Sequence, residues 1–148
     1  MKKNSVISII IILLILLTAI LFVRGCSQEG SEMKSYTVAG TYTETTTYQN
    51  GEIKVSGVNI ENATFTGNLT VVDSVVDGDI HLTNSAVQGE LLIKGGGTVY
   101  LDGGTYQNIT LEKQGVKIVL LGQATVETLT ARAATNIVVD NQSKIKTL

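Results

Sequence analysis

The chain has 148 residues, a formal net charge of −2 and 43% hydrophobic residues, enough for one folded domain and an additional segment. From Tyr36 onward, seven Lys and Arg residues stand against eleven Asp and Glu residues, a net charge of −4. A nucleic-acid-binding domain needs a basic face, and docking to anionic lipid by charge needs a basic cluster, so this composition argues against both. The single cysteine, Cys26, excludes an intrachain disulfide framework and a cysteine zinc site.

Residues 6–23 form an almost uninterrupted apolar run near the N-terminus. As an α-helix this run would be about 27 Å long, close to the ~30 Å bilayer core. It is also longer than the apolar core of a cleaved signal peptide, which has about 7–15 residues. Lys2 and Lys3 precede the run, which favours a cytoplasmic N-terminus. The pattern predicts a cytoplasmic tip at residues 1–5, a single-pass signal-anchor at residues 6–23, and an extracellular remainder.

Cys26 comes just after the predicted membrane segment. The run Val23-Arg24-Gly25-Cys26 resembles a bacterial lipobox, except that Arg24 occupies a position that is normally small and uncharged. Cys26 is therefore either a lipidation site or an unmodified juxtamembrane thiol, and both readings leave the domain tethered at a membrane. The polar, aperiodic residues 24–35 are predicted to be a flexible linker.

Residues 36–57 alternate in the manner of strands but lack the motif that recurs later. Tyr36, Val38 and Tyr42 are interleaved with threonines, which suit a half-exposed pleated surface. Asn50-Gly51 is a strong turn signal. Because terminal repeats differ from internal ones to keep the end of a solenoid soluble, we expect residues 36–57 to be N-terminal capping strands.

Residues 58–148 carry pairs of apolar residues separated by one residue, and these pairs return at near-regular intervals. One series begins at Val58, Ile80, Val99, Ile118 and Ile137, and the other at Leu69, Leu91, Ile109 and Leu129. The first series advances by 22, 19, 19 and 19 residues, so one coil has about 20 residues and two strands. Side chains alternate between the faces of a strand, and fixed-period self-similarity indicates a solenoid. The sequence therefore predicts an all-β fold, a parallel β-helix of four to five coils in which each series forms an interior column.

Glycine and Asn or Asp residues recur at the positions where the chain must turn between strands. Both types tolerate the left-handed backbone conformation that sharp corners require. The predicted corner residues are Gly67, Gly78 and Gly89 on one side, and Asn62, Asp73 and Asn84 with their later equivalents Gly103 and Gln123 on the other.

Few residues carry recognisable chemistry. The only histidine, His81, lies between two inward positions and is expected to face solvent without a catalytic partner. Asp73, Asp77 and Asp79 are the best acidic group, but calcium needs about six to eight oxygen ligands, so solvated corner acids are the simpler interpretation. Tyr100 and Tyr106 are expected to face outward beside neighbouring threonines, and this face is either plain solvent-exposed surface or a shallow carbohydrate-binding face. We predict no catalytic residue, no metal site and no cofactor.

The steps Gly78-Asp79-Ile80 and Gly89-Glu90-Leu91, followed by the glycine-rich corner at residues 93–97, resemble right-handed parallel β-helix proteins of the pectin-lyase-like superfamily. The likeness is to repeat-bearing surface proteins of Gram-positive bacteria, and it implies a right-handed coil. In pectate lyases, acids on one outer face bind calcium and a nearby base takes the proton. Here Arg132 lies some 50 residues beyond the acidic group. Bactofilins, with similar Gly-Asp-Ile steps but shorter coils, are the weaker alternative.

We expect no segment to cover the C-terminal end of the solenoid. Nine residues follow Ile137-Val138-Val139, and they contain no amphipathic helix. An uncovered coil is a sheet edge that can pair with another strand. Either the charges at Asp140, Lys144 and Lys146 suffice to protect this edge, or it supports end-to-end self-association or docking of another partner.

These patterns predict a membrane-anchored solenoid of the cell envelope with a structural role, or one that binds a protein or carbohydrate, and with no enzymatic activity. Two alternatives stay open. The first is a degenerate β-helix of the polysaccharide lyase or hydrolase type. The second is a bactofilin-like self-assembling scaffold, which would lie on the cytoplasmic side.

Overall fold

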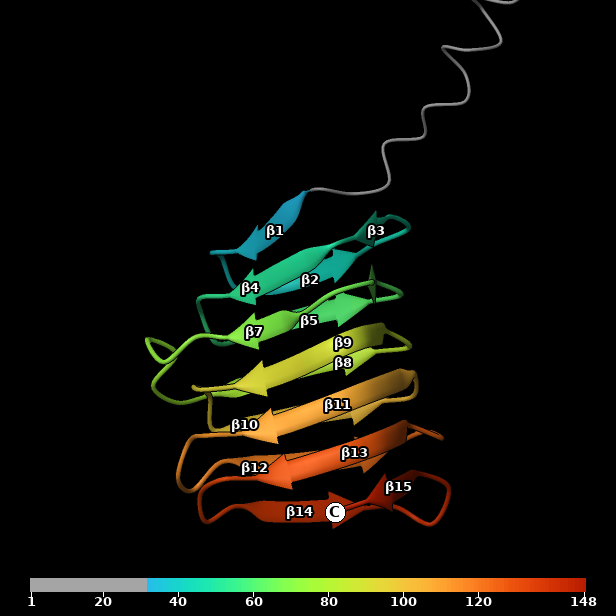
Figure 1. Cartoon of the computed structure of the whole chain (residues 1–148). Coiled ribbons are helices and arrows are strands. Elements are labelled where there is room, and N and C mark those ends of the chain that lie inside the picture. The colour runs from blue at the N-terminus through green and yellow to red at the C-terminus, as the bar shows by residue number, and fades with distance from the viewer. Residues whose placement is uncertain (1–31) are drawn as a thin grey trace, which may run out of the picture.

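A computed structural model describes residues 32–148, which fold into strands joined by turns (Figure 1). Within this range no helix is long and apolar enough to cross a membrane. The predicted signal-anchor over residues 6–23 and the lipidation candidate Cys26 lie outside the described residues.

The strands form two parallel sheets that face each other across the core. The nine-stranded sheet contains β1 (Met33–Tyr36), β3 (Thr47–Tyr48), β4 (Asn50–Ile53), β6 (Thr64–Phe65), β7 (Leu69–Val71), β9 (Ala86–Ile93), β11 (Thr105–Leu111), β13 (Thr125–Ala131) and β15 (Lys144–Thr147). The six-stranded sheet contains β2 (Gly40–Thr43), β5 (Val58–Glu61), β8 (Asp79–Thr83), β10 (Thr98–Asp102), β12 (Lys117–Leu121) and β14 (Asn136–Val139).

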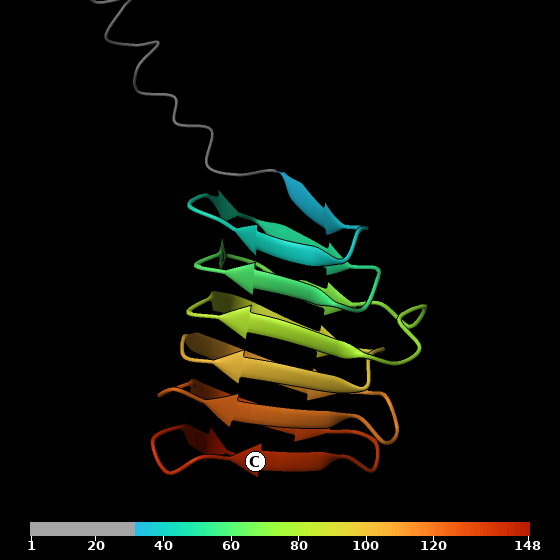
Figure 2. The same ribbon diagram turned by 180° about the vertical axis from the view of Figure 1, so that it is seen from behind.

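The prediction of an all-β parallel solenoid is confirmed, because strands pair in parallel with those one turn earlier and one turn later. In Figures 1 and 2, the strands nearest the viewer run to the left while the chain descends, which is a right-handed winding. The solenoid has about six turns rather than the predicted four to five. The additional turn arises because β2 pairs with β5, and β4 with β7, in the same parallel ladder as the later strands. β1 already begins at Met33, inside the segment predicted as a linker.

The predicted interior column exists. Ile80 is the register partner of both Val58 and Val99, and the ladder continues through Ile118 to Ile137. The first four of these side chains are 0% exposed, whereas Ile137, on the last turn, is partly exposed and packs against the core from one side. The second predicted column, from Leu69 to Leu129, is also in register and buried. Stacked aliphatic columns of this kind form the core that no single turn could bury alone.

The left-handed corners are confirmed at some predicted positions. Asn62, Asn84 and Gln123 have φ values of 60°, 48° and 70°, and Gly78 and Gly103 have φ values of 102° and 73°. The same prediction is wrong for Asp73, Gly67 and Gly89, which are not left-handed.

Gly67 and Gly89 occur where an asparagine side chain from the previous turn crosses the backbone. Asn50 Oδ1 accepts a hydrogen bond from the Asn68 N–H at 2.8 Å, and Asn68 Oδ1 accepts one from the Glu90 N–H at 2.9 Å. A Cβ atom on Gly67 or on Gly89 would lie 2.5 Å from the Oδ1 of Asn50 or of Asn68, respectively. These two glycines are therefore required by close approach between turns and not by backbone conformation.

Candidate functional site

Of the acidic group predicted from sequence, Asp73 and Asp77 lie in the segment between β7 and β8, which protrudes from the side of the solenoid (Figure 1), and Asp79 is the first residue of β8. Asp73, Asp77 and Asp79 are all exposed. Lys113 Nζ lies 3.6 Å from Asp77 Oδ1 and donates hydrogen bonds to the carbonyls of Val76 and, at 2.7 Å, Gly96. Lys113 thus ties this loop to the next turn.

The acids of this loop do not converge on a point where a cation could sit. Within residues 32–148, no group of three or more His, Cys, Asp or Glu side chains is placed to hold a metal ion. All three carboxylates remain open to solvent on this side of the fold.

Tyr100 faces outward on the six-stranded sheet, where it stacks on His81. The two residues are register partners on β10 and β8. Their ring centroids are 4.4 Å apart and their planes differ by 5°. His81 is exposed, as expected from its place between two inward residues. The sequence already placed Ile80 beside Val99, and therefore His81 beside Tyr100. Only the structure shows that their two rings stack into one flat surface.

Tyr106 is a core residue, and the prediction that it faces outward is wrong. Its side chain is 1% exposed and lies between Val87 and Val126 in an inward column. Alternation fails here because Gln107 and Asn108 are both exposed, so two consecutive residues separate Tyr106 from the inward Ile109. Burial raises the pKa of the Tyr106 hydroxyl far above its usual value, and no hydrogen-bond partner reaches it.

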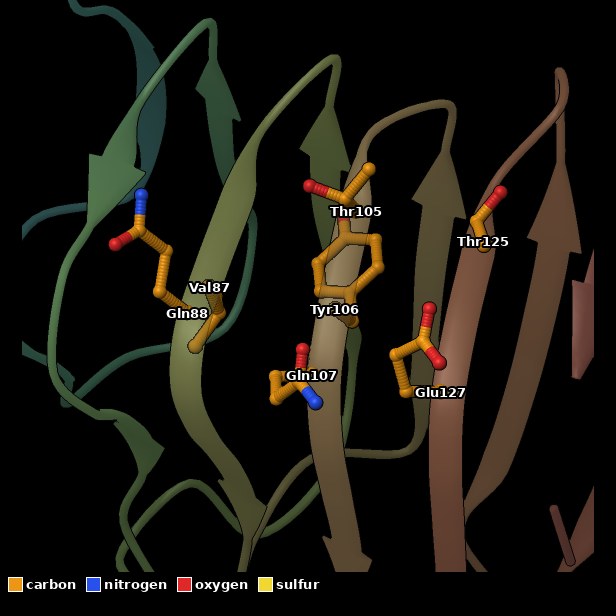
Figure 3. Close-up of a pocket in the computed structure, with 7 residues that line it drawn as sticks. All are labelled: Val87, Gln88, Thr105, Tyr106, Gln107, Thr125 and Glu127. Atoms are coloured by element: carbon orange, nitrogen blue, oxygen red, sulfur yellow. The ribbon is translucent and has the colours of Figure 1, made fainter. Parts of the chain in front are cut away.

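A shallow hollow of about 120 Å³ opens beside Tyr106 on the nine-stranded sheet (Figure 3). Its polar lining comes from three adjacent strands through Gln88, Gln107 and Glu127. Glu127 is already engaged, because Lys146 Nζ lies 2.5 Å from its Oε1 atom. The hollow is large enough to hold several water molecules. The lining also includes the side chains of Thr105 and Thr125.

The first turn of the solenoid is closed by aromatic rings and an ion pair. The ring of the fully buried Tyr36 lies 4.9 Å from that of Tyr42, edge to face. Lys34 Nζ lies 3.0 Å from Glu44 Oε1, and the Tyr48 hydroxyl donates a 2.7 Å hydrogen bond to Glu44 Oε2. We call these five residues, Lys34, Tyr36, Tyr42, Glu44 and Tyr48, the tyrosine lid.

Hydrogen bonds also set the charge state of the tyrosine lid. The bond to Glu44 raises the pKa of Lys34 above its usual value. Burial opposes ionisation of Glu44, but the hydrogen bonds from Tyr48 and Lys34 outweigh it and hold the pKa of Glu44 below its usual value. Both groups therefore remain charged near neutral pH, so the lid presents a fixed ion pair at this end of the fold.

The last turn has no equivalent cover. β14 pairs with β12, and β15 with β13, and in residues 32–148 neither strand has a partner on its other side. Val138 and Val139 are 39% and 41% exposed, and Leu148 is 79% exposed. The Asp140 carboxylate is already hydrogen-bonded within its own copy of the fold. A hydrogen bond involving Ser143 lowers its pKa, and the carboxylate also accepts hydrogen bonds from the N–H groups of Ser143, Gln142 and Gly122. The open last turn, comprising β14 and β15, is therefore a free edge for strand pairing, as are β1 and β2 on the first turn, which also have a partner on one side only within residues 32–148.

A scan against protein-family models, a search of curated proteins and a search of solved structures each found no match to this chain.

Proposed function

We propose that this chain is a membrane-anchored β-solenoid of the bacterial cell envelope, and that it works by holding a partner at its open last turn without catalysing a reaction. The observation that carries the proposal is the contrast between the two ends of the solenoid. Each terminal turn leaves one row of backbone groups unpaired within residues 32–148, but the first turn carries the tyrosine lid with its Lys34–Glu44 ion pair, whereas β14 on the last turn carries exposed valine side chains.

An open strand of this kind is suited to binding by strand addition. The unpaired N–H and C=O groups supply hydrogen bonds to any added strand, and the side-chain pockets on alternate positions select its sequence. Natural solenoids and sheets normally cover or charge such edges. On β14, Asn136, Val138 and Val139 leave the edge without a charge until Asp140.

The anchoring part of the proposal rests on the sequence. The apolar run over residues 6–23 is long enough to span a bilayer, and residues 24–32 connect it to β1, which begins at Met33. The described chain enters the fold at β1, on the closed turn, while the open last turn lies at the opposite end (Figure 1). A partner could therefore reach β14 and β15 without passing the point where the chain enters the solenoid.

The finer family assignment is also part of this proposal. Kinship with pectin-lyase-like β-helices is supported by the Gly-Asp-Ile and Gly-Glu-Leu steps and by the right-handed winding. A bactofilin-like scaffold with the solenoid in the cytoplasm is the second candidate, and the open last turn favours it because assembly needs a free end. Nothing comparable favours a polysaccharide lyase, because the acids of the β7–β8 loop do not converge.

Two experiments on the full chain in intact cells test this function. External protease should digest the solenoid if it lies outside the cell, whereas protection until lysis would contradict the envelope assignment and favour the cytoplasmic scaffold. A photo-activated cross-linking residue at Val138, on β14, should form protein adducts. The same residue at Val76, an equally aliphatic position that is 70% exposed on the β7–β8 loop, is the matched control. Equal yields at both positions, or none at Val138, would refute a docking role for the open last turn.

A further inference from the structure

We infer that the partner of the open last turn is a second copy of this chain, joined tail to tail about a two-fold axis with β14 of each copy against β15 of the other. The inference rests on the proposed function, since it names the strand that the open turn accepts.

The tyrosine lid argues against head-to-tail stacking of copies. Such stacking would press the last turn of one copy onto Lys34 and Glu44 of the next and remove their ion pair from water. Desolvating a charged pair costs more than its mutual attraction returns unless further hydrogen bonds compensate. The apolar rungs at Ile137 and Val139 offer no such hydrogen bonds. Two identical open turns meet no such obstacle, and identical patches facing each other form a closed two-fold interface.

Charge selects between the two possible tail-to-tail arrangements. If β15 faced β15 of the other copy, Lys144 and Lys146 would meet the same lysines, and like charges directly opposite each other destabilise a strand pair. If β14 faces β15 instead, the lysines meet the uncharged Asn136 and Val138 and approach Asp140. The aliphatic stems of the lysines can then cover Val138 while the ammonium groups remain in water.

The inward residues also agree with this arrangement. Ile137 on β14 and Ile145 on β15 each pack partly against the core of their own copy, so each sheet ends in one inward isoleucine. Placing β14 over β15 of the other copy continues both sheets and puts aliphatic residues of one copy beneath those of the other. The interior columns would then run through both molecules without a break.

The interface is small, because it is one solenoid turn in cross-section, whereas a standard stable interface buries about 800 Å² on each partner. We therefore expect association to depend on concentration and to be strengthened when the chains share a compartment. Residues 24–32, between the predicted membrane segment and β1, can extend to about 30 Å, and six strands at about 4.8 Å spacing stack to about 25 Å. Both copies could thus remain anchored in one membrane with the solenoids lying along it.

Paired cysteines test the inference in the full chain. In a Cys26→Ser background, which removes the native thiol, Val138→Cys combined with Lys146→Cys should give a covalent dimer on mild oxidation in membranes. The two positions point outward from opposite sheets of one copy, and such sheets are about 10 Å apart. A disulfide needs Cα atoms within about 7 Å, so the pair cannot close within one chain.

The single variants and a displaced pair serve as controls. Val138→Cys alone, Lys146→Cys alone, and Val76→Cys combined with Lys146→Cys should each give several-fold less dimer. Dimer formation by Val138→Cys alone, at the level of the double variant, would show β14 against β14 and overturn the arrangement. Absence of dimer from the double variant, while the cross-linking residue at Val138 captures a different protein, would overturn the inference and leave the proposed function standing. Absence of both signals would remove the proposed function as well.

Discussion

Replacing Ile80 by alanine should destabilise the solenoid far more than the same replacement at Ile137, although both residues belong to one interior column. Ile80 is 0% exposed, with Val58 on one side and Val99 on the other. Ile137 has Ile118 on one side and no neighbouring turn within the described chain on the other. The two substitutions remove the same atoms, so they differ only in whether a turn of the solenoid covers the residue on both sides.

The expected costs follow from the carbon atoms removed and the cavity left behind. Isoleucine to alanine removes three carbon groups, worth about 0.8 kcal/mol each when buried, and core cavities bring such changes to about 2–5 kcal/mol. At Ile80 the turns above and below hold the cavity open, so we expect about 3–4 kcal/mol. At Ile137 the site is partly exposed and free to collapse, so we expect about 1 kcal/mol. Ile80→Asp should abolish folding, because it buries a charge without a partner.

Urea unfolding of the full chain in detergent, followed by circular dichroism of the sheet, measures both free energies. Dilute protein should be used, since association at the last turn would add to the apparent stability of the parent. If the slope of the unfolding free energy against urea concentration is unchanged, the variants expose the same amount of surface on unfolding as the parent. Equal costs at Ile80 and Ile137, or a cost below about 1 kcal/mol at Ile80, would contradict a continuous inner stack.

Three further substitutions probe other parts of the fold. Gly89→Ala should cost on the order of 1–3 kcal/mol, because the added Cβ would lie 2.5 Å from both Asn68 Oδ1 and the carbonyl oxygen of Gly67; thermal unfolding measures the loss, and shortening Asn68 to alanine in the same chain should recover part of it. Tyr106→Phe should raise the stability by about 1 kcal/mol, since the hydroxyl is buried without a partner; a lowered melting temperature would reveal a partner instead. Glu44→Gln should lower stability at pH 7. The folded pKa of Glu44 lies below its ordinary value of 4.5, so the stability that its ionised form contributes is present above that value and lost as the pH falls through the folded pKa. The variant should therefore lose less stability between pH 5 and pH 3 than the parent. Parallel curves of stability against pH for the two proteins would refute this role.

The sequence alone determined the class of fold and most of its register. Alternation of aliphatic residues along a strand and their return about every 20 residues are local properties, so Val58, Ile80 and Val99 could be placed in one column before any coordinates. Residues at left-handed corners were found in the same way, because the steric preference of Asn62 and Asn84 acts within a few atoms of their own backbone.

The tertiary structure decided the features that depend on contacts between turns. Tyr106 points inward because two consecutive outward residues interrupt the alternation at a bend, and the residues alone do not show where that bend falls. Gly67 and Gly89 are glycines because asparagine side chains from the preceding turn occupy the space of a Cβ atom. A contact of this kind requires both the register and the three-dimensional path of the chain.

The two ends show the same division most clearly. That residues 140–148 carry no amphipathic helical pattern is visible in the sequence. That Lys34 and Glu44 close the opposite end requires bringing together side chains from β1 and from the segment between β2 and β3. The alternation of apolar residues in the sequence shows which residues face inward within a turn, because the strand backbone points successive side chains to opposite faces. The closing of an end depends on side-chain packing and ion pairing between segments with no shared period, and only the folded chain brings these together.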